Sequence, residues 1–323
     1  MKRALVLGGA GLVGSAIARR FVEVGWRVTV IDGFLARTFA SESHLEGILD
    51  RIELLRFPVE SVRDLPERAR SADIVIDAMG WTRHTEAERD PLYDLGLNLA
   101  SHVAFLCAAA AAPPRRIIAI GSRHQFGAQA GVFDDDAPFA PMDIQSVHKC
   151  AAEQHFRLFA ERTGTEVISL RVGNCFGPGL PVGQGDVGLI GGFVRDILGD
   201  RTLLLYEGKR LRNVAYTPDI AALVVALTAC PLRGFAGLNY PGHDIEVSDL
   251  ATALVHAFGK GKIERIPMPP EHTAREIGAG KFQSSLLPQL VPDFTPTPLD
   301  AALAATAATI LRGAVREKTR QQA

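Results

Sequence analysis

The sequence predicts an α/β fold, a doubly wound parallel sheet followed by a smaller C-terminal α+β region. In the first half, short apolar runs alternate with amphipathic stretches, as in parallel sheets covered by helices on both faces. A glycine-rich segment, Gly8–Gly14, separates the first apolar run from the first amphipathic stretch. After about Asn174 glycine and proline cluster, and shorter elements follow.

Six short runs rich in β-branched residues are predicted to form the buried strands. They are Ala4–Leu7, Arg27–Ile31, Ile52–Leu55, Ile74–Asp77, Arg116–Ile120 and Val167–Leu170. The amphipathic stretches predicted to be helices are Ser15–Val24, Tyr93–Ala112 and Ser146–Arg162. Pro113 and Pro114 end the second helix because proline restricts the backbone of the preceding residue.

The second half is predicted to mix short strands with helices. The strands are Leu203–Tyr206 and Asn213–Tyr216, and the helices are Asp219–Thr228, Val247–Phe258 and Leu299–Leu311. We therefore expect two regions. Residues 1–173, with about 212–240, form the sheet domain, and about 174–211 and 241–315 form a substrate-binding region.

Composition excludes several classes of function. The 323 residues carry 35 basic and 36 acidic side chains, so we expect neither a nucleic-acid nor a membrane partner. The four cysteines have no spacing typical of metal ligands, and we expect no metal. Glycines interrupt the apolar N-terminal run, and we expect no segment near the roughly 20 residues that span a bilayer. These features indicate a soluble, cytoplasmic protein.

The spacing of Gly8, Gly11 and Gly14 is typical of the Rossmann turn that binds dinucleotides. One glycine makes the tight turn, one lets the backbone approach a pyrophosphate, and one allows helix and strand to pack closely. Asp32 ends the second strand, where a carboxylate can accept hydrogen bonds from the adenosine ribose. An acid there repels the 2′-phosphate of NADP, so we expect the cofactor to be NAD. Arg37, slightly further along the chain, keeps NADP as an alternative.

Further motifs follow in order over nearly the whole chain. They are Asp73–Gly80, Asp90-Pro91 with Asn98, Ser122 with Phe126-Gly127, Arg171–Gly179, and Arg212 with Asp219. Together with the glycine turn, they make the sequence similar to the NAD-dependent epimerase/dehydratase family of extended short-chain dehydrogenases. The resemblance implies contacts with NAD from Gly8, Gly11, Leu12, Val13, Gly14, Asp32, Ala78, Met79, Gly80, Asn98 and Lys149.

One departure concerns the catalytic tyrosine of this family. That tyrosine stands four residues before a lysine on a helix, and it takes a hydroxyl proton while hydride leaves the same carbon. Here the lysine is Lys149, and Gln145 stands four residues before it. A glutamine amide cannot act as a general base near neutral pH. The chain has no tyrosine between Tyr93 and Tyr206, so a shifted alignment cannot supply one.

Three interpretations follow. In the first, another residue takes the proton: Ser122 matches the family's catalytic Ser/Thr, and His124 lies where sugar-nucleotide dehydratases carry an acid. His148 and His84 are weaker candidates. In the second, a desolvated Lys149 is itself the acid/base. In the third, hydride transfer is lost and the chain is an NAD(H)-binding sensor or regulatory protein.

The resemblance also implies a substrate and a partner. Residues matching Asn174 and Arg212 commonly contact the diphosphate of a nucleotide sugar, and arginine suits phosphate because its planar guanidinium donates hydrogen bonds in pairs. Arg275 is a weaker second candidate. We therefore expect an epimerase/dehydratase-like enzyme that acts on a nucleotide sugar or a related hydroxy or keto compound, with altered acid/base chemistry. The helices 93–112 and 146–162 match those of a four-helix dimer interface, which implies a homodimer.

Overall fold

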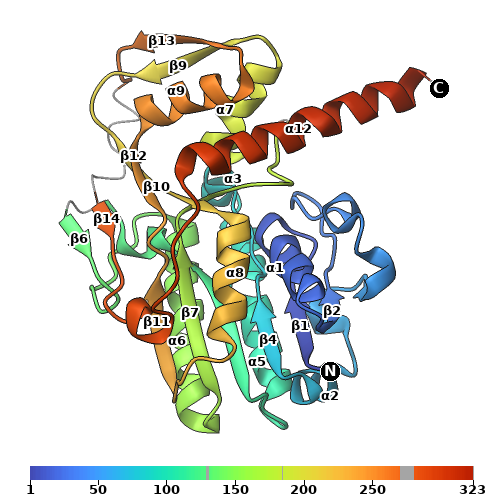
Figure 1. Cartoon of the computed structure of the whole chain (residues 1–323). Coiled ribbons are helices and arrows are strands. Elements are labelled where there is room, and N and C mark those ends of the chain that lie inside the picture. Colours follow the sequence, from blue (N-terminus) through green and yellow to red (C-terminus); the bar gives the residue numbers. More distant parts are fainter. Residues whose placement is uncertain (129–130, 184, 270–279, 323) are drawn as a thin grey trace.

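A seven-stranded sheet forms the centre of the computed structural model, which describes residues 1–128, 131–183, 185–269 and 280–322 (Figure 1). All six pairs of neighbouring strands are parallel, which confirms the predicted doubly wound α/β fold. In sheet order the strands are β11 (Phe235–Asn239), β7 (Glu166–Val172), β5 (Arg116–Ser122), β4 (Ile74–Asp77), β1 (Arg3–Leu7), β2 (Arg27–Ile31) and β3 (Ile52–Leu55). The strand order reverses between β1 and β4, which opens a crevice at their carboxyl ends.

Helices cover both faces of this sheet (Figure 1). One face packs against α1 (Leu12–Glu23) and α8 (Thr217–Leu227), and the other against α2 (Leu65–Ser71), α5 (Ser101–Ala109) and α6 (Ile144–Thr163). Along β1, alternate side chains enter the two cores. Because both faces of the sheet are buried, its strands consist mostly of consecutive apolar residues.

The helix predicted over Tyr93–Ala112 runs from α4 (Pro91–Leu95) through a π-helical segment (Gly96–Ala100) into α5. Contrary to expectation, Pro91–Ala109 is long and apolar enough to cross a membrane by length and composition, with a mean hydropathy of 1.3. Core helices of soluble proteins meet the same criterion. Here Asp94, Asn98 and His102 are buried inside the protein, an arrangement that suits a core helix.

A second region stands above the carboxyl edge of the sheet (Figure 1). It contains a three-stranded sheet in the order β12–β10–β8 and a two-stranded sheet of β9 and β13, with α7, α9 and α12 packed on them. The bounds are β8 (Asn174–Phe176), α7 (Gly188–Leu198), β9 (Thr202–Tyr206), β10 (Leu211–Tyr216), β12 (His243–Glu246), α9 (Val247–Phe258), β13 (Lys262–Ile266) and α12 (Leu299–Gln322). Strand β10 thus pairs within this region, whereas the following α8 packs on the large sheet and β11 is one of its strands.

Short elements complete the connections between these layers. They are α3 (His84–Arg89), β6 (Gly131–Phe133), β14 (Gly280–Phe282), α11 (Leu287–Leu290) and the 3-10 segment Arg123–Phe126, with further 3-10 turns at Glu42–Leu45, Leu49–Arg51 and Val59–Ser61. Strand β14 pairs in parallel with β6. The segment Arg123–Phe126 directly follows β5 and so lies at the carboxyl edge of the sheet.

Candidate active site

A cavity of about 680 Å³ opens at the carboxyl edge of the sheet and is lined by residues of both regions. It brings together nearly all the residues that the sequence singled out. Those on its wall are Gly8, Gly11, Leu12, Val13, Gly14, Asp32, Ala78, Met79, Gly80, Ser122, His124, Gln145, Lys149, Asn174 and Arg212. Asn98, the remaining predicted cofactor residue, is fully buried and is not on the wall.

The glycine turn has the close contacts that require glycine. Gly8 has a φ of +71°, a conformation that residues with a side chain rarely adopt. A Cβ at Gly14 would lie 2.2 Å from the carbonyl oxygen of Gly8, so a side chain there would push helix and turn apart. At Gly11 a Cβ would meet only that same oxygen, at 3.5 Å, and Gly11 lines the cavity. The backbone of the turn is therefore open to a ligand.

Asp32 holds this turn in place from the end of β2. Its carboxylate accepts hydrogen bonds from the backbone N–H groups of Ala10 and Phe34, each at 2.9 Å. Burial raises the pKa of Asp32, and the two N–H donors and nearby His44 partly oppose that rise. Asp32 also lines the cavity, so it lies within reach of a bound ligand.

Arg37, which left NADP open, is engaged outside the cavity wall. Its guanidinium pairs with Asp90 at 2.7 Å and with Glu86 at 3.3 Å. It also lies over the rings of Trp81 and Tyr93, 4.7 and 4.5 Å from their centroids. These contacts engage the Arg37 guanidinium with Glu86, Asp90, Trp81 and Tyr93.

Lys149 lines the cavity and lies against the loop that follows β4. Its ammonium donates to the carbonyl oxygen of Met79 at 3.4 Å. A Cβ at Gly80 would lie 2.7 Å from the Lys149 Nζ, so glycine leaves the room that the lysine occupies. Burial lowers the pKa of Lys149, while the carboxylates of Asp77 and Asp94 oppose the change.

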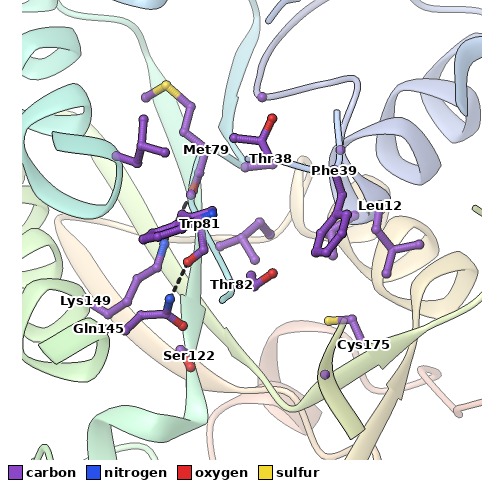
Figure 2. A pocket seen from close by; sticks show the side chains of 18 of the residues that line it. Leu12, Thr38, Phe39, Met79, Trp81, Thr82, Ser122, Gln145, Lys149 and Cys175 are labelled. Carbon is purple, nitrogen blue, oxygen red and sulfur yellow. Dashed lines mark hydrogen bonds between the residues drawn. The ribbon is translucent and has the colours of Figure 1, made fainter. Parts of the chain in front are cut away.

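Gln145 is bonded into the buried structure around Trp81. Its amide donates to the Trp81 carbonyl oxygen at 2.6 Å and to the Asp94 carboxylate at 3.3 Å, and Figure 2 shows this amide directed at Trp81. The same carboxylate accepts from Asn98 at 2.7 Å and lies 2.6 Å from the Nδ1 of His148. Gln145 and Asn98 therefore belong to one buried network, and His148 reaches that network rather than the cavity.

Ser122 is positioned by a chain of buried polar contacts. Its backbone N–H donates to the Gln125 side chain at 2.9 Å, and the Gln125 amide donates to Glu153 at 2.9 Å. Glu153 forms a buried ion pair with Arg171, 2.6 Å long. The Ser122 hydroxyl accepts a hydrogen bond from the backbone N–H of His124 at 3.2 Å. This chain joins α6, β5 and β7, and it fixes the segment that presents Ser122 and His124 to the cavity.

Two histidines and an aspartate meet on the cavity wall. The rings of His84 and His124 stack with their centroids 4.3 Å apart. The Asp143 Oδ2 lies 2.9 Å from the Nδ1 of His84 and 3.8 Å from that of His124. Burial lowers the pKa of His124 to about 3, helped by the charge of His84 and opposed by Asp143. His124 is therefore a neutral imidazole near neutral pH.

Sequence reasoning missed Asp143. Its other oxygen accepts from the backbone N–H of Ser146 at 2.7 Å, so Asp143 is the N-cap of α6. An aspartate before an amphipathic run is a known N-cap signal, but the helix was predicted to begin at Ser146. Burial raises the pKa of Asp143, but hydrogen bonds from His124, His84 and Ser146 together hold it well below its usual range.

The far end of the cavity is formed by the second region. Asn174 and Arg212 lie on the neighbouring strands β8 and β10, and both line the wall. The Arg212 guanidinium donates to the carbonyl oxygen of Leu211 at 2.8 Å. Arg275, the weaker phosphate candidate, lies outside the described residues. The glycine turn and Arg212, from different regions of the fold, thus line the same cavity.

Comparison with known proteins identifies the family. The model of the NAD dependent epimerase/dehydratase family matches residues 4–240. A putative UDP-glucose 4-epimerase of Methanocaldococcus jannaschii is 22% identical over 260 residues, which cover 79% of this chain and 82% of the relative.

Solved structures share the fold. A UDP-N-acetylglucosamine 4-epimerase from Methanobrevibacter ruminantium M1, in complex with UDP-N-acetylmuramic acid, has a TM-score of 0.86 at 18% identity over 97% of this chain and 99% of its own. A UDP-glucuronic acid 4-epimerase from Bacillus cereus, in complex with UDP-glucuronic acid and NAD, has a TM-score of 0.83 at 18% identity over 96% and 99%. Because the family match spans most of its length, this chain belongs to the NAD-dependent epimerase/dehydratase family.

Proposed function

We propose that this chain is an NAD-dependent enzyme that transforms a nucleotide sugar through oxidation and re-reduction of one sugar carbon. Its family and the UDP-sugar enzymes among its relatives support this proposal. We further propose that Gln145 replaces the family's tyrosine, and that the acid/base function lies with His124 and its neighbours. The observation that carries this second step is the convergence of His84, His124 and Asp143 on the cavity wall.

The cavity residues fit a dinucleotide. The turn at Gly8–Gly14 leaves its backbone open to a pyrophosphate, because Gly11 lines the cavity and has no side chain to cover it. Asp32 would accept hydrogen bonds from the adenosine ribose, and Lys149 would hold the nicotinamide ribose across Gly80. NAD, when bound, supplies a hydride acceptor. With an acid at position 32 and Arg37 engaged elsewhere, NAD is preferred over NADP.

The proton of the reacting hydroxyl would pass to this chain's own residues. The Ser122 hydroxyl would hold the substrate oxygen, as the family's Ser/Thr does. His124, on the cavity wall, would accept the proton, and Asp143 would orient its ring and stabilise the imidazolium, which burial otherwise disfavours. The buried amide of Gln145 would take no part in proton transfer, because its donors already bond to Trp81 and Asp94.

Substrate binding is proposed for the far end of the cavity. Arg212 and Asn174 line the wall there, and a guanidinium suits a diphosphate because it donates hydrogen bonds in pairs. In this arrangement the diphosphate would anchor the nucleotide sugar, and its sugar would face Ser122 and His124.

A homodimer is also proposed, on the basis of one exposed face. Val147 and Leu158 lie 11 residues apart on α6 and are 48% and 42% exposed, and Leu92 at the start of α4 is 78% exposed. On a helix of 3.6 residues per turn, a spacing of 11 places Val147 and Leu158 on one face. A second copy of the chain would bury these side chains.

The experiment that tests the function combines the NAD-loaded protein with a panel of UDP- and dTDP-sugars and follows each sugar by NMR. The proposal predicts that the wild type converts at least one sugar. His256→Ala, a control variant at an exposed position on α9, should convert that sugar equally well. A second candidate is an NAD(H)-binding sensor, which the buried Gln145 amide favours. A protein that distinguishes NAD from NADH in binding, yet leaves every sugar unchanged, would be such a sensor.

A further inference from the structure

His84, His124 and Asp143 place three metal-binding side chain types at one point. Among the residues that the structure describes, they are the only group of at least three such side chains whose ligand atoms all lie within 4.8 Å of one another. They come from separate elements: the first residue of α3, the 3-10 segment after β5, and the N-cap of α6. The fold therefore brings together residues that are 40 and 19 positions apart in the chain.

We infer that His84, His124 and Asp143 hold a divalent transition-metal ion in the wall of the cavity. Two imidazoles and one carboxylate are a ligand set that suits Zn²⁺, Fe²⁺ and related ions. Catalytic sites for such ions use three protein ligands and leave a further position open. The binding stands on the geometry of the three side chains, whereas the chemical role of the ion rests on the proposed function.

The distances are close to those of a loaded site. Ligands of a tetrahedral ion at zinc-like bond lengths lie about 3.3 Å apart. The Asp143 Oδ2 lies 2.9 Å from the His84 Nδ1 and 3.8 Å from the His124 Nδ1, on either side of that value. The widest separation among the three ligand atoms is at most 4.8 Å, so an ion has to draw them together by about 1.5 Å or less. Rotation of the histidine side chains between rotamers would have to supply this movement.

The carboxylate is already oriented for this task. One oxygen of Asp143 accepts the Ser146 N–H at 2.7 Å, which directs the other oxygen at the histidines. Such bonds behind a ligand usually set its orientation and strengthen metal binding. The side chains of His84, His124 and Asp143 are 34%, 17% and 29% exposed, and all three line the cavity. One side of the ion would therefore face the cavity, open to water or to a sugar hydroxyl.

An ion in this position supplies the function that Gln145 lacks. A hydroxyl bound to a divalent ion has a lowered pKa and releases its proton near neutral pH. The proton would pass to water in the cavity, and the oxygen would stay bound to the ion beside Ser122. The ion would thus activate the hydroxyl from which the family's tyrosine takes the proton, and His124 would act in the loaded protein as a ligand of the ion rather than as the proton acceptor.

The test uses the full chain without an affinity tag, freed of metal by a chelator and then dialysed. It is titrated with Zn²⁺ alone by calorimetry and with Co²⁺ alone by visible absorption. We expect one ion per chain, with binding at least tenfold weaker in His84→Ala and in His124→Ala. Asp143→Asn should also weaken binding, while α6 keeps its start because asparagine is an equally good N-cap. His256→Ala, on the exposed side of α9, should bind as the wild type does.

Two outcomes separate this inference from the proposed function. If the wild type binds Zn²⁺ and Co²⁺ no more tightly than the double variant His84→Ala/His124→Ala, the inferred site does not exist. If the wild type freed of metal still converts a nucleotide sugar, the proposed function stands with His124 as the acid/base. If the ion binds through these residues but no sugar is converted with or without it, the metal site stands and the proposed function fails.

Discussion

Gln145, which we propose replaces the family's tyrosine, has the contacts of a structural residue. Its amide serves two buried acceptors at once, the Trp81 carbonyl and the Asp94 carboxylate. An amide is suited to this because it carries two N–H donors. The sequence alone indicated that position 145 lacks a base. It did not indicate this pairing, because the partners lie 64 and 51 positions away.

Gln145→Met tests whether this residue is structural. The change leaves Trp81 and Asp94 with one donor fewer, so we expect the free energy of unfolding in urea to fall by about 1–3 kcal/mol. We expect the turnover of a nucleotide sugar to fall by less than tenfold. Gln289→Met, an exposed change on α11, is the control and should alter neither. A variant of unchanged stability and abolished turnover would make Gln145 a catalytic group instead.

Asp32→Asn tests the choice of cofactor. Asparagine keeps one acceptor for the N–H groups of Ala10 and Phe34 but removes the charge that repels a 2′-phosphate. We expect the ratio of NADP affinity to NAD affinity to rise at least tenfold, which corresponds to about 1.4 kcal/mol. Calorimetric titrations with both cofactors measure it, with the exposed Asp50→Asn as control. An unchanged ratio would mean that Asp32 does not face the ribose.

At the scale of elements, most of the large sheet could be predicted. Strands buried on both faces give continuous apolar runs, and the structure has β2, β3 and β4 with the predicted bounds. Strand β11 was missed because Phe235–Asn239 contains a glycine and an asparagine, which are typical of turns. It becomes a strand through pairing with β7, a tertiary contact that local sequence does not reveal.

Helix α6 carries Gln145 and Lys149 of the cavity wall, and a buried ion pair holds it to the sheet. Glu153 pairs with Arg171 on β7 and also accepts from Gln125 and Ser169. Glu153→Ala leaves the Arg171 charge buried and unpaired, so we expect the free energy of unfolding to fall by about 3–5 kcal/mol. Chemical denaturation measures this, and Glu161→Ala on the exposed side of α6 is the control. Equal stability of the two variants would show that the ion pair is dispensable.

At the scale of the whole molecule, the cavity gathers residues from position 8 to position 212. Their convergence was predictable in part, because parallel strands end together at the carboxyl edge of a sheet. The contact between His84 and Asp143 could not be predicted, because both residues lie in connections between strands, whose course depends on tertiary packing. The expectation that the chain binds no metal came from cysteine spacing, which carries no information about such a cluster.

The proposed dimer belongs to this scale as well. Leu158→Arg places a charge on the exposed face of α6, where a partner would have to desolvate it. We expect light scattering to show a dimer for the wild type and a monomer for this variant. Leu204→Arg, on β9 in the second region and 55% exposed, should leave the dimer intact. A monomeric wild type, or a dimeric Leu158→Arg variant, would contradict the proposed interface.

The most direct test of the central claim, that proton transfer has moved from position 145 to the cluster around His124, is the rate at which His124→Ala converts a sugar that the wild type converts. General acid/base groups contribute roughly 10²–10⁴ to a rate, so we predict a loss of at least about 100-fold. NAD affinity and the free energy of unfolding should stay close to those of the wild type. A His124→Ala variant with the full wild-type rate would contradict this claim and make Lys149 the next candidate for the acid/base.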